Sequence, residues 1–169
     1  MKKIVITGPE STGKTTLARR LAADLGVPFV EEYARKYLEV YGLHYEEEDL
    51  LNIASGQRKA EQKVAASEPE WLICDTDLLT IKIWSVEKYG RVDARILEQK
   101  SIPVDLYMLL RPTISWEADP QREHPSDRDR LYNLYKKELK TQAMTYIEVD
   151  PTKKNFYEQV KFHTFMLRE

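Results

Sequence analysis

The chain is poor in the features that anchor, cross-link or export a protein. It has one cysteine in 169 residues, which excludes intrachain disulfides and a cysteine-rich zinc site. No hydrophobic run approaches the roughly 20 residues of a membrane span. The basic start is interrupted at Gly8, too early for a signal peptide. These absences predict a cytoplasmic protein that makes no contact with a membrane.

An excess of one charge is also missing. Lys and Arg number 26 and Asp and Glu number 28, which gives a net charge of −2. A nucleic-acid-binding protein would carry a basic surplus or a basic stripe, so we expect no nucleic-acid partner. The length and the 42% of hydrophobic residues are typical of one globular domain, here residues 1–169. The oligomeric state is left open.

Apolar runs and segments of helical period alternate along the chain, which predicts an α/β fold. An open parallel five-stranded sheet with helices on both faces is expected, because such alternation builds right-handed crossovers. The expected strands are residues 3–7, 27–30, 71–74, 104–110 and 145–149. The expected helices are residues 15–25, 32–41, 46–67, 78–89, 92–100, 127–143 and 154–167.

The stretch from residue 111 to residue 130 breaks this pattern. Four of the six prolines after Pro28 lie within residues 103–125, and the surrounding sequence is polar and rich in arginine. Long loops in compact domains are usually functional. We expect a lid centred on residues 112–126.

Residues 8–15 match the P-loop (Walker A) pattern G-x-x-x-x-G-K-[ST]. Gly8 and Gly13 allow the backbone N–H groups to face phosphate oxygens. Lys14 reaches the β- and γ-phosphates, and Thr15 offers its hydroxyl to Mg²⁺. A strand before the loop and a helix after it complete the context. The pattern predicts binding of Mg²⁺ and ATP by Gly8, Glu10, Ser11, Thr12, Gly13, Lys14, Thr15 and Thr16.

Carboxylates follow the third expected strand. Asp75 directly follows residues 71–74, where a Mg²⁺-binding carboxylate is expected beside Thr15. Asp77 has two interpretations, a cap for the next helix or a contact to substrate. Cys74 is expected to be a buried strand residue.

A second charged cluster follows the second expected strand, at the sheet edge where α/β proteins bind ligands. Glu32 is the candidate general base, Arg35 a candidate phosphate contact, and Tyr33 lies between them. Glu31 is equally well explained as a solvated residue. With no Asn-Lys-x-Asp motif, a kinase is favoured over a GTPase.

The lid supplies the remaining candidates. Arg122 is expected over the transferring phosphoryl group, whereas Arg128 and Arg130 fit a helix start and a surface ion pair. Trp116 is preferred to Trp84 as a ligand contact, since tryptophans are more often core residues. His124 is a weaker phosphate candidate. Thr152, in the loop after the last strand, is either an adenine contact or part of a turn.

These pieces together resemble the NadR-type ribosylnicotinamide kinase domain of the P-loop kinase superfamily. The resemblance rests on residues 8–15, Glu-Tyr-Ala-Arg at 32–35, Cys-Asp-Thr-Asp at 74–77 and Trp-Glu-Ala-Asp-Pro-Gln-Arg at 116–122. Pro120 stands where the family's lid has glycine.

The resemblance implies phosphorylation of the 5′-hydroxyl of nicotinamide riboside by ATP, which yields nicotinamide mononucleotide in NAD synthesis or salvage. It also implies that Trp116 holds the pyridinium ring and that Glu32 and Asp77 hold ribose hydroxyls. Two alternatives remain open: a kinase for another nucleoside or small metabolite, and a regulatory ATPase that is not a kinase.

Overall fold

The computed structural model describes residues 1–122 and 126–168. Its five strands are β1 (Lys2–Thr7), β2 (Phe29–Val30), β3 (Trp71–Asp75), β4 (Leu106–Leu110) and β5 (Tyr146–Val149). They form one sheet in the order β2-β3-β1-β4-β5, with parallel pairing throughout. The expected parallel five-stranded sheet is therefore confirmed.

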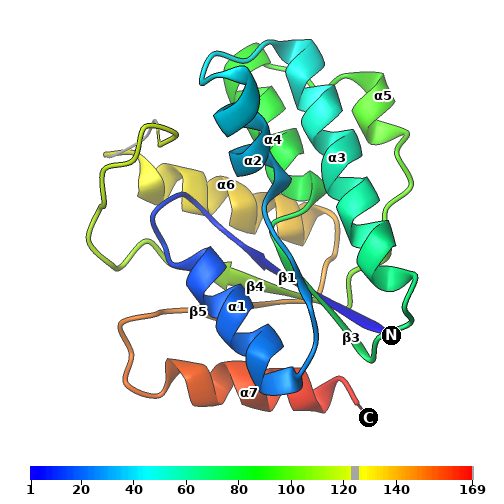
Figure 1. The fold of residues 1–169 in the computed structure, drawn as a ribbon. Helices are drawn as coiled ribbons and strands as arrows, with labels where there is room; N and C mark the ends of the chain where they lie inside the picture. The colour runs from blue at the N-terminus through cyan, green and yellow to red at the C-terminus, as the bar shows by residue number, and fades with distance from the viewer. Residues whose placement is uncertain (123–125, 169) are drawn as a thin grey trace.

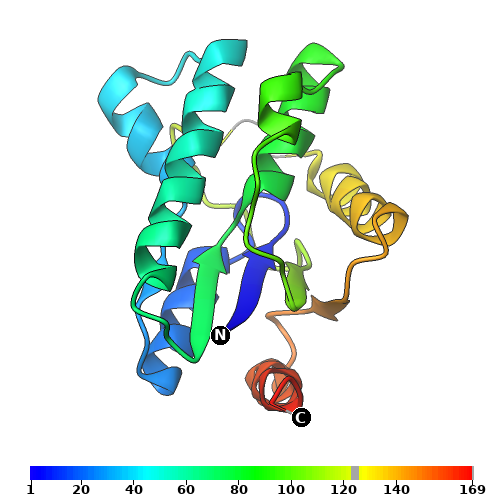
Figure 2. The same ribbon diagram turned by 90° about the vertical axis from the view of Figure 1, so that its right-hand side faces the viewer.

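The helices are α1 (Lys14–Leu25), α2 (Tyr33–Tyr41), α3 (Glu47–Ala65), α4 (Leu78–Tyr89), α5 (Ala94–Leu97), α6 (Arg128–Thr141) and α7 (Phe156–Met166). α1 and α7 cover one face of the sheet, and α3, α4 and α6 cover the other (Figures 1 and 2). Helices on both faces agree with the expectation. Among the helices of the described residues, none combines the length and hydrophobicity that crossing a membrane requires.

Several elements are shorter than expected, and a local contact accounts for the later start of two of them. β2 loses its first two residues because the Val27 amide bonds the Ala22 carbonyl at the end of α1 (3.0 Å) instead of the sheet. The helix expected at residues 92–100 is a single turn that begins after Asp93, which caps it by accepting the Arg95 amide (2.8 Å).

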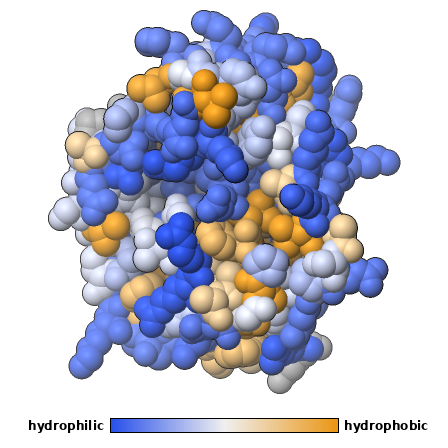
Figure 3. Space-filling model, in the orientation of Figure 1, coloured by the Kyte–Doolittle hydropathy of each residue, from blue (hydrophilic) through white to orange (hydrophobic). Residues whose placement is uncertain are grey.

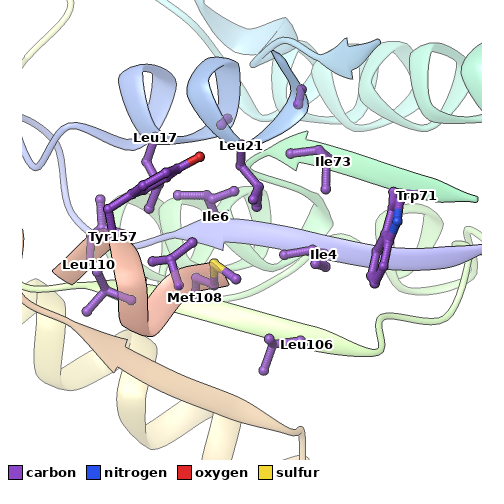
Figure 4. Packing of buried hydrophobic residues seen from close by; sticks show 14 residues of the cluster. Ile4, Ile6, Leu17, Leu21, Trp71, Ile73, Leu106, Met108, Leu110 and Tyr157 are labelled. Atoms are coloured by element: carbon purple, nitrogen blue, oxygen red, sulfur yellow. The ribbon is translucent and has the colours of Figure 1, made fainter. Parts of the chain in front are cut away.

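Strand alternation divides the core. On β1, Ile4 and Ile6 pack with Leu17, Met108 and other apolar side chains under α1 and α7 (Figure 4). Val5 faces the opposite side, toward α4 and α6. A third apolar cluster joins α2, α3, α4 and α5 to one another, away from the sheet.

The carboxyl ends of the parallel strands all lie at one edge, where ligands bind in open α/β sheets. β1 leads there into α1 through the P-loop, and the lid chain lies beside it (Figure 1). In the same orientation the middle of the surface is mainly hydrophilic, and apolar side chains gather in a patch to its lower right and in smaller groups near the top (Figure 3).

Candidate active site

The P-loop is held in its curl by glycine at two positions. Gly8 has φ 132°, and a Cβ there would lie 2.8 Å from the Leu110 carbonyl oxygen, so any side chain would collide with the end of β4. Gly13 has φ 87° and precedes the first residue of α1. The loop therefore delivers its N–H groups and the positive end of α1 to one point.

The loop side chains reinforce this shape. Thr12 Oγ1 and Lys14 Nζ both donate to the Pro9 carbonyl oxygen, at 2.9 and 2.8 Å. The eight predicted nucleotide-binding residues of the loop all line a single cavity of about 580 Å³. This arrangement is chemically suited to hold a polyphosphate.

A cation position lies beside the loop. Thr15 Oγ1 donates to Asp75 Oδ2 at 2.5 Å, and Asp75 is buried at the end of β3. Asp75 Oδ1 is buried without a hydrogen-bond partner within the described part of the chain. Burial raises the pKa of Asp75, and the Lys14 ammonium opposes that rise.

These two oxygen donors fit Mg²⁺. The residues described contain no cluster of three or more His, Cys, Asp or Glu side chains arranged to hold a metal. Mg²⁺ commonly takes one or two carboxylates and completes its shell with substrate phosphates and water. Thr15 and Asp75 are thus candidate ligands for a cation that arrives with a nucleotide.

Glu32 lines the same cavity at the residue preceding α2. Its partial burial raises its pKa to about 7, with Lys14 lowering it and Asp75 raising it further. A carboxylate that titrates near neutrality can accept a proton from a hydroxyl group. Burial and its neighbours therefore equip Glu32 for the predicted role of base, whereas Glu31 is exposed.

The lid is fastened to the P-loop through Ser11. Ser11 Oγ accepts the Glu117 amide at 3.0 Å and Arg122 Nη1 at 3.4 Å. Arg128 Nη1 donates to the Ser11 carbonyl oxygen at 2.9 Å, from the first residue of α6. Arg122 lines the cavity as expected.

The remaining charged candidates, from the lid region and from α2, form ion pairs. Arg130 pairs with Glu87 and Asp127, which agrees with its expected surface ion pair, although it also borders the cavity. His124 lies outside the described residues. Arg35, expected to contact phosphate, borders the cavity and pairs with Asp119 of the lid at 3.1 Å.

The far end of the cavity has apolar and aromatic walls that the sequence prediction missed. Tyr45 and Trp84 lie with ring centroids 6.2 Å apart and planes at 28°. Lys88 Nζ donates to the Tyr45 carbonyl oxygen at 2.6 Å and covers the Tyr45 ring. The available signal was spacing on α4, where Thr80, Trp84 and Glu87 share one helical face.

Four residues predicted to contact ligands do not line the cavity. The Trp116 ring lies beside the Arg128 guanidinium, whereas Trp84 lines the cavity. The Tyr33 ring packs against Gly56 of α3. Asp77 accepts hydrogen bonds from the Leu79 amide, which caps α4, and from the Tyr107 hydroxyl. These contacts favour the capping interpretation. The Thr152 amide and hydroxyl both donate to Asp150 Oδ1, which favours the interpretation of this segment as a turn.

Comparisons with known proteins agree with this geometry. The family model described as AAA domain matches residues 3–156. The ATP-dependent protease ATPase subunit HslU of Staphylococcus aureus (strain JH9) is 30% identical over 91 residues, which cover 52% of this chain and 20% of HslU. The chain thus spans about a fifth of this curated relative.

Solved structures extend the likeness to the whole fold. The NadR protein in complex with NR superposes with a TM-score of 0.72 at 23% identity, over 91% of this chain and 46% of the NadR chain. Thymidylate kinase from Ehrlichia chaffeensis gives a TM-score of 0.68 at 14% identity, over 99% of this chain and 98% of that enzyme. The expected resemblance to a P-loop kinase of the NadR type is confirmed at the level of the fold.

Proposed function

The chain belongs to the AAA domain family, and we propose that its P-loop binds Mg²⁺ and ATP. We further propose that it phosphorylates the 5′-hydroxyl of nicotinamide riboside. One observation carries the proposal. The P-loop, Glu32 and the Tyr45–Trp84 pair all line one continuous cavity, so a phosphoryl donor and an aromatic acceptor can meet there. The likeness to NadR in complex with NR supports this acceptor.

At the donor end, the P-loop amides and Lys14 hold the β- and γ-phosphates. Thr15 and Asp75 hold Mg²⁺, which neutralises charge on the phosphates. Arg122 reaches the cavity from the lid and faces the charge that develops on the transferring group. A lid bonded to Ser11 also keeps water from the phosphoryl group.

At the acceptor end, Glu32 takes the proton of the 5′-hydroxyl. The 5′-oxygen forms a bond to the γ-phosphorus while the bond from that phosphorus to the β,γ-bridging oxygen breaks, and ADP leaves. Trp84 offers an aromatic face to the cationic pyridinium ring, an attraction worth about 0.5–2 kcal/mol, whereas the Tyr45 ring is already covered by the Lys88 ammonium.

A coupled assay of ADP release tests the proposal. Purified protein is given Mg²⁺ and ATP with nicotinamide riboside, thymidine, deoxyadenosine or no acceptor, and Lys14→Ala serves as the control for contaminating kinases. We expect nicotinamide riboside to stimulate ADP release far above the background hydrolysis and to yield nicotinamide mononucleotide.

Two other results would point elsewhere. Stimulation by a different nucleoside alone would refute this acceptor and retain the kinase. Hydrolysis that no acceptor stimulates would favour the ATPase activity named for the HslU relatives.

A further inference from the structure

The middle of α3 holds a buried glutamine that bonds two strand ends. Gln57 is 2% exposed and does not line the cavity. Its Oε1 accepts the Tyr33 amide at 2.9 Å, and its Nε2 donates to the Thr76 carbonyl oxygen at 3.4 Å. Tyr33 follows Glu32, and Thr76 follows Asp75, so one side chain joins the segments that carry both carboxylates.

Gly56, the residue before Gln57, also contacts Tyr33, and the contact is possible only because glycine has no side chain. A Cβ on Gly56 would lie 2.1 Å from Tyr33 Cε1, which is impossible without moving the ring. Glycine in a helix interior costs about 1 kcal/mol relative to alanine. Gly56 therefore accepts a cost in α3 and provides the space in which the Tyr33 ring packs.

Thr76, at the other end of the Gln57 contact, has a strained backbone conformation. Thr76 has φ 63°, in the left-handed region that β-branched residues avoid. Such backbone strain persists only where surrounding contacts hold it. The Thr76 amide bonds the Ile6 carbonyl oxygen at 3.0 Å, and Gln57 binds its carbonyl, so both polar groups of this peptide segment are held.

From these contacts we propose that Gly56 and Gln57 are positioning residues that fix Glu32 relative to Asp75. Gln57 sets the spacing of the two strand ends through its amide, and Gly56 sets the position of the Tyr33 ring and therefore of the start of α2. Neither residue touches the reacting atoms. The inference rests on the proposed function, since it assumes that Glu32 acts on the acceptor and Asp75 on the cation.

The first test replaces Gln57 by methionine, which keeps the length of the side chain and removes both bonds. Gln62→Met, at an exposed position on the same helix, is the matched control. Hydrogen exchange of the Tyr33 amide, followed by NMR, measures the lost bond without reference to catalysis. We expect at least tenfold faster exchange in Q57M and no change in Q62M.

Kinetics give the functional arm of the same test. We expect Q57M to lower kcat by roughly 10- to 100-fold, with the KM for ATP within about twofold of the parent, because misplacement by about 1 Å is costly in turnover. Faster amide exchange with kcat within twofold of Q62M would overturn the positioning role. If no acceptor is phosphorylated by the parent protein, the proposed function fails, and the exchange result still decides whether Gln57 holds Tyr33.

A second pair of variants covers the case in which Q57M does not fold. Gly56→Ala should raise helix propensity yet lower kcat by a similar factor, because its Cβ displaces the Tyr33 ring. Tyr33→Leu creates space, so the double variant should recover the turnover of Y33L alone. Parent-like kcat in G56A, or a double variant with a lower kcat than Y33L alone, would refute the inference.

Discussion

Replacing Glu32 by glutamine removes the proposed base while keeping the size of its side chain. With Glu32 titrating at about 7, about a tenth of the molecules carry the carboxylate at pH 6 and nine tenths at pH 8. The parent kcat/KM, which reports the free enzyme, should therefore rise about tenfold from pH 6 to pH 8. Glu32→Gln should lower turnover by roughly 10²–10⁴ and lose this pH dependence.

The same substitution should change stability in the opposite direction. Burial raises the pKa of folded Glu32 from 4.5 to about 7, so between these values the folded state binds more protons than the unfolded state. Stability of the parent then falls as the pH rises through this window. At about 1.4 kcal/mol per pH unit the limit is ~3 kcal/mol, and partial solvent access reduces the expected cost to ~1–2 kcal/mol.

Urea unfolding of both proteins at pH 5 and pH 8 measures this cost. We expect the variant to gain ~1–2 kcal/mol over the parent at pH 8 and about a quarter of that at pH 5. Nucleotide affinity, measured by calorimetry, should stay near that of the parent. If Glu32→Gln had the turnover of the parent, Glu32 would not be the base and would be explained as a solvated residue at the start of α2. Equal stability differences at both pH values would show that its pKa is not raised in the folded protein.

Three further predictions address other parts of the chain. Lys14→Ala should abolish phosphoryl transfer, measured by ADP release, while the fold survives by circular dichroism. Trp84→Leu should raise the acceptor KM roughly 2- to 30-fold, whereas Trp116→Leu, outside the cavity, should leave it unchanged. Glu61→Gln should cost ~3–5 kcal/mol in urea unfolding because it strands the buried Lys3 ammonium, which Glu61 contacts at 2.6 Å. The double change to Lys3→Met and Glu61→Leu should recover most of that loss, and no recovery would contradict the pairing argument.

The sheet was predictable because its strands are buried on both faces and therefore read as unbroken apolar runs. β1, β3 and β4 were each located within about two residues for this reason. β2 keeps only half of its four predicted residues, since whether the Val27 amide joins the sheet or closes α1 depends on where α1 ends in space. Local pattern carries no information on that choice.

The donor end of the site was likewise predictable, because the P-loop is continuous in sequence and its chemistry demands particular residue types. The proposed acceptor end is assembled from α4 and the loop between α2 and α3, so the pairing of Tyr45 with Trp84 follows only from tertiary packing. Asp77 and Thr152 show the converse. Each is polar and lies near the predicted site along the chain, but its polar atoms have other partners. Asp77 accepts from the Leu79 amide and the Tyr107 hydroxyl, and Thr152 donates to the Asp150 carboxylate.

The third apolar cluster, which joins α2, α3, α4 and α5 away from the sheet, limits which substitutions the acceptor wall can accept. Tyr45 and Trp84 belong to this cluster, while the P-loop is anchored against β4 through Gly8. On the proposed function, substitutions at Tyr45 and Trp84 would alter the acceptor wall without touching the P-loop. The same layer contains Tyr33, so only substitutions that leave the Tyr33 ring in place would preserve the relation between Glu32 and Asp75.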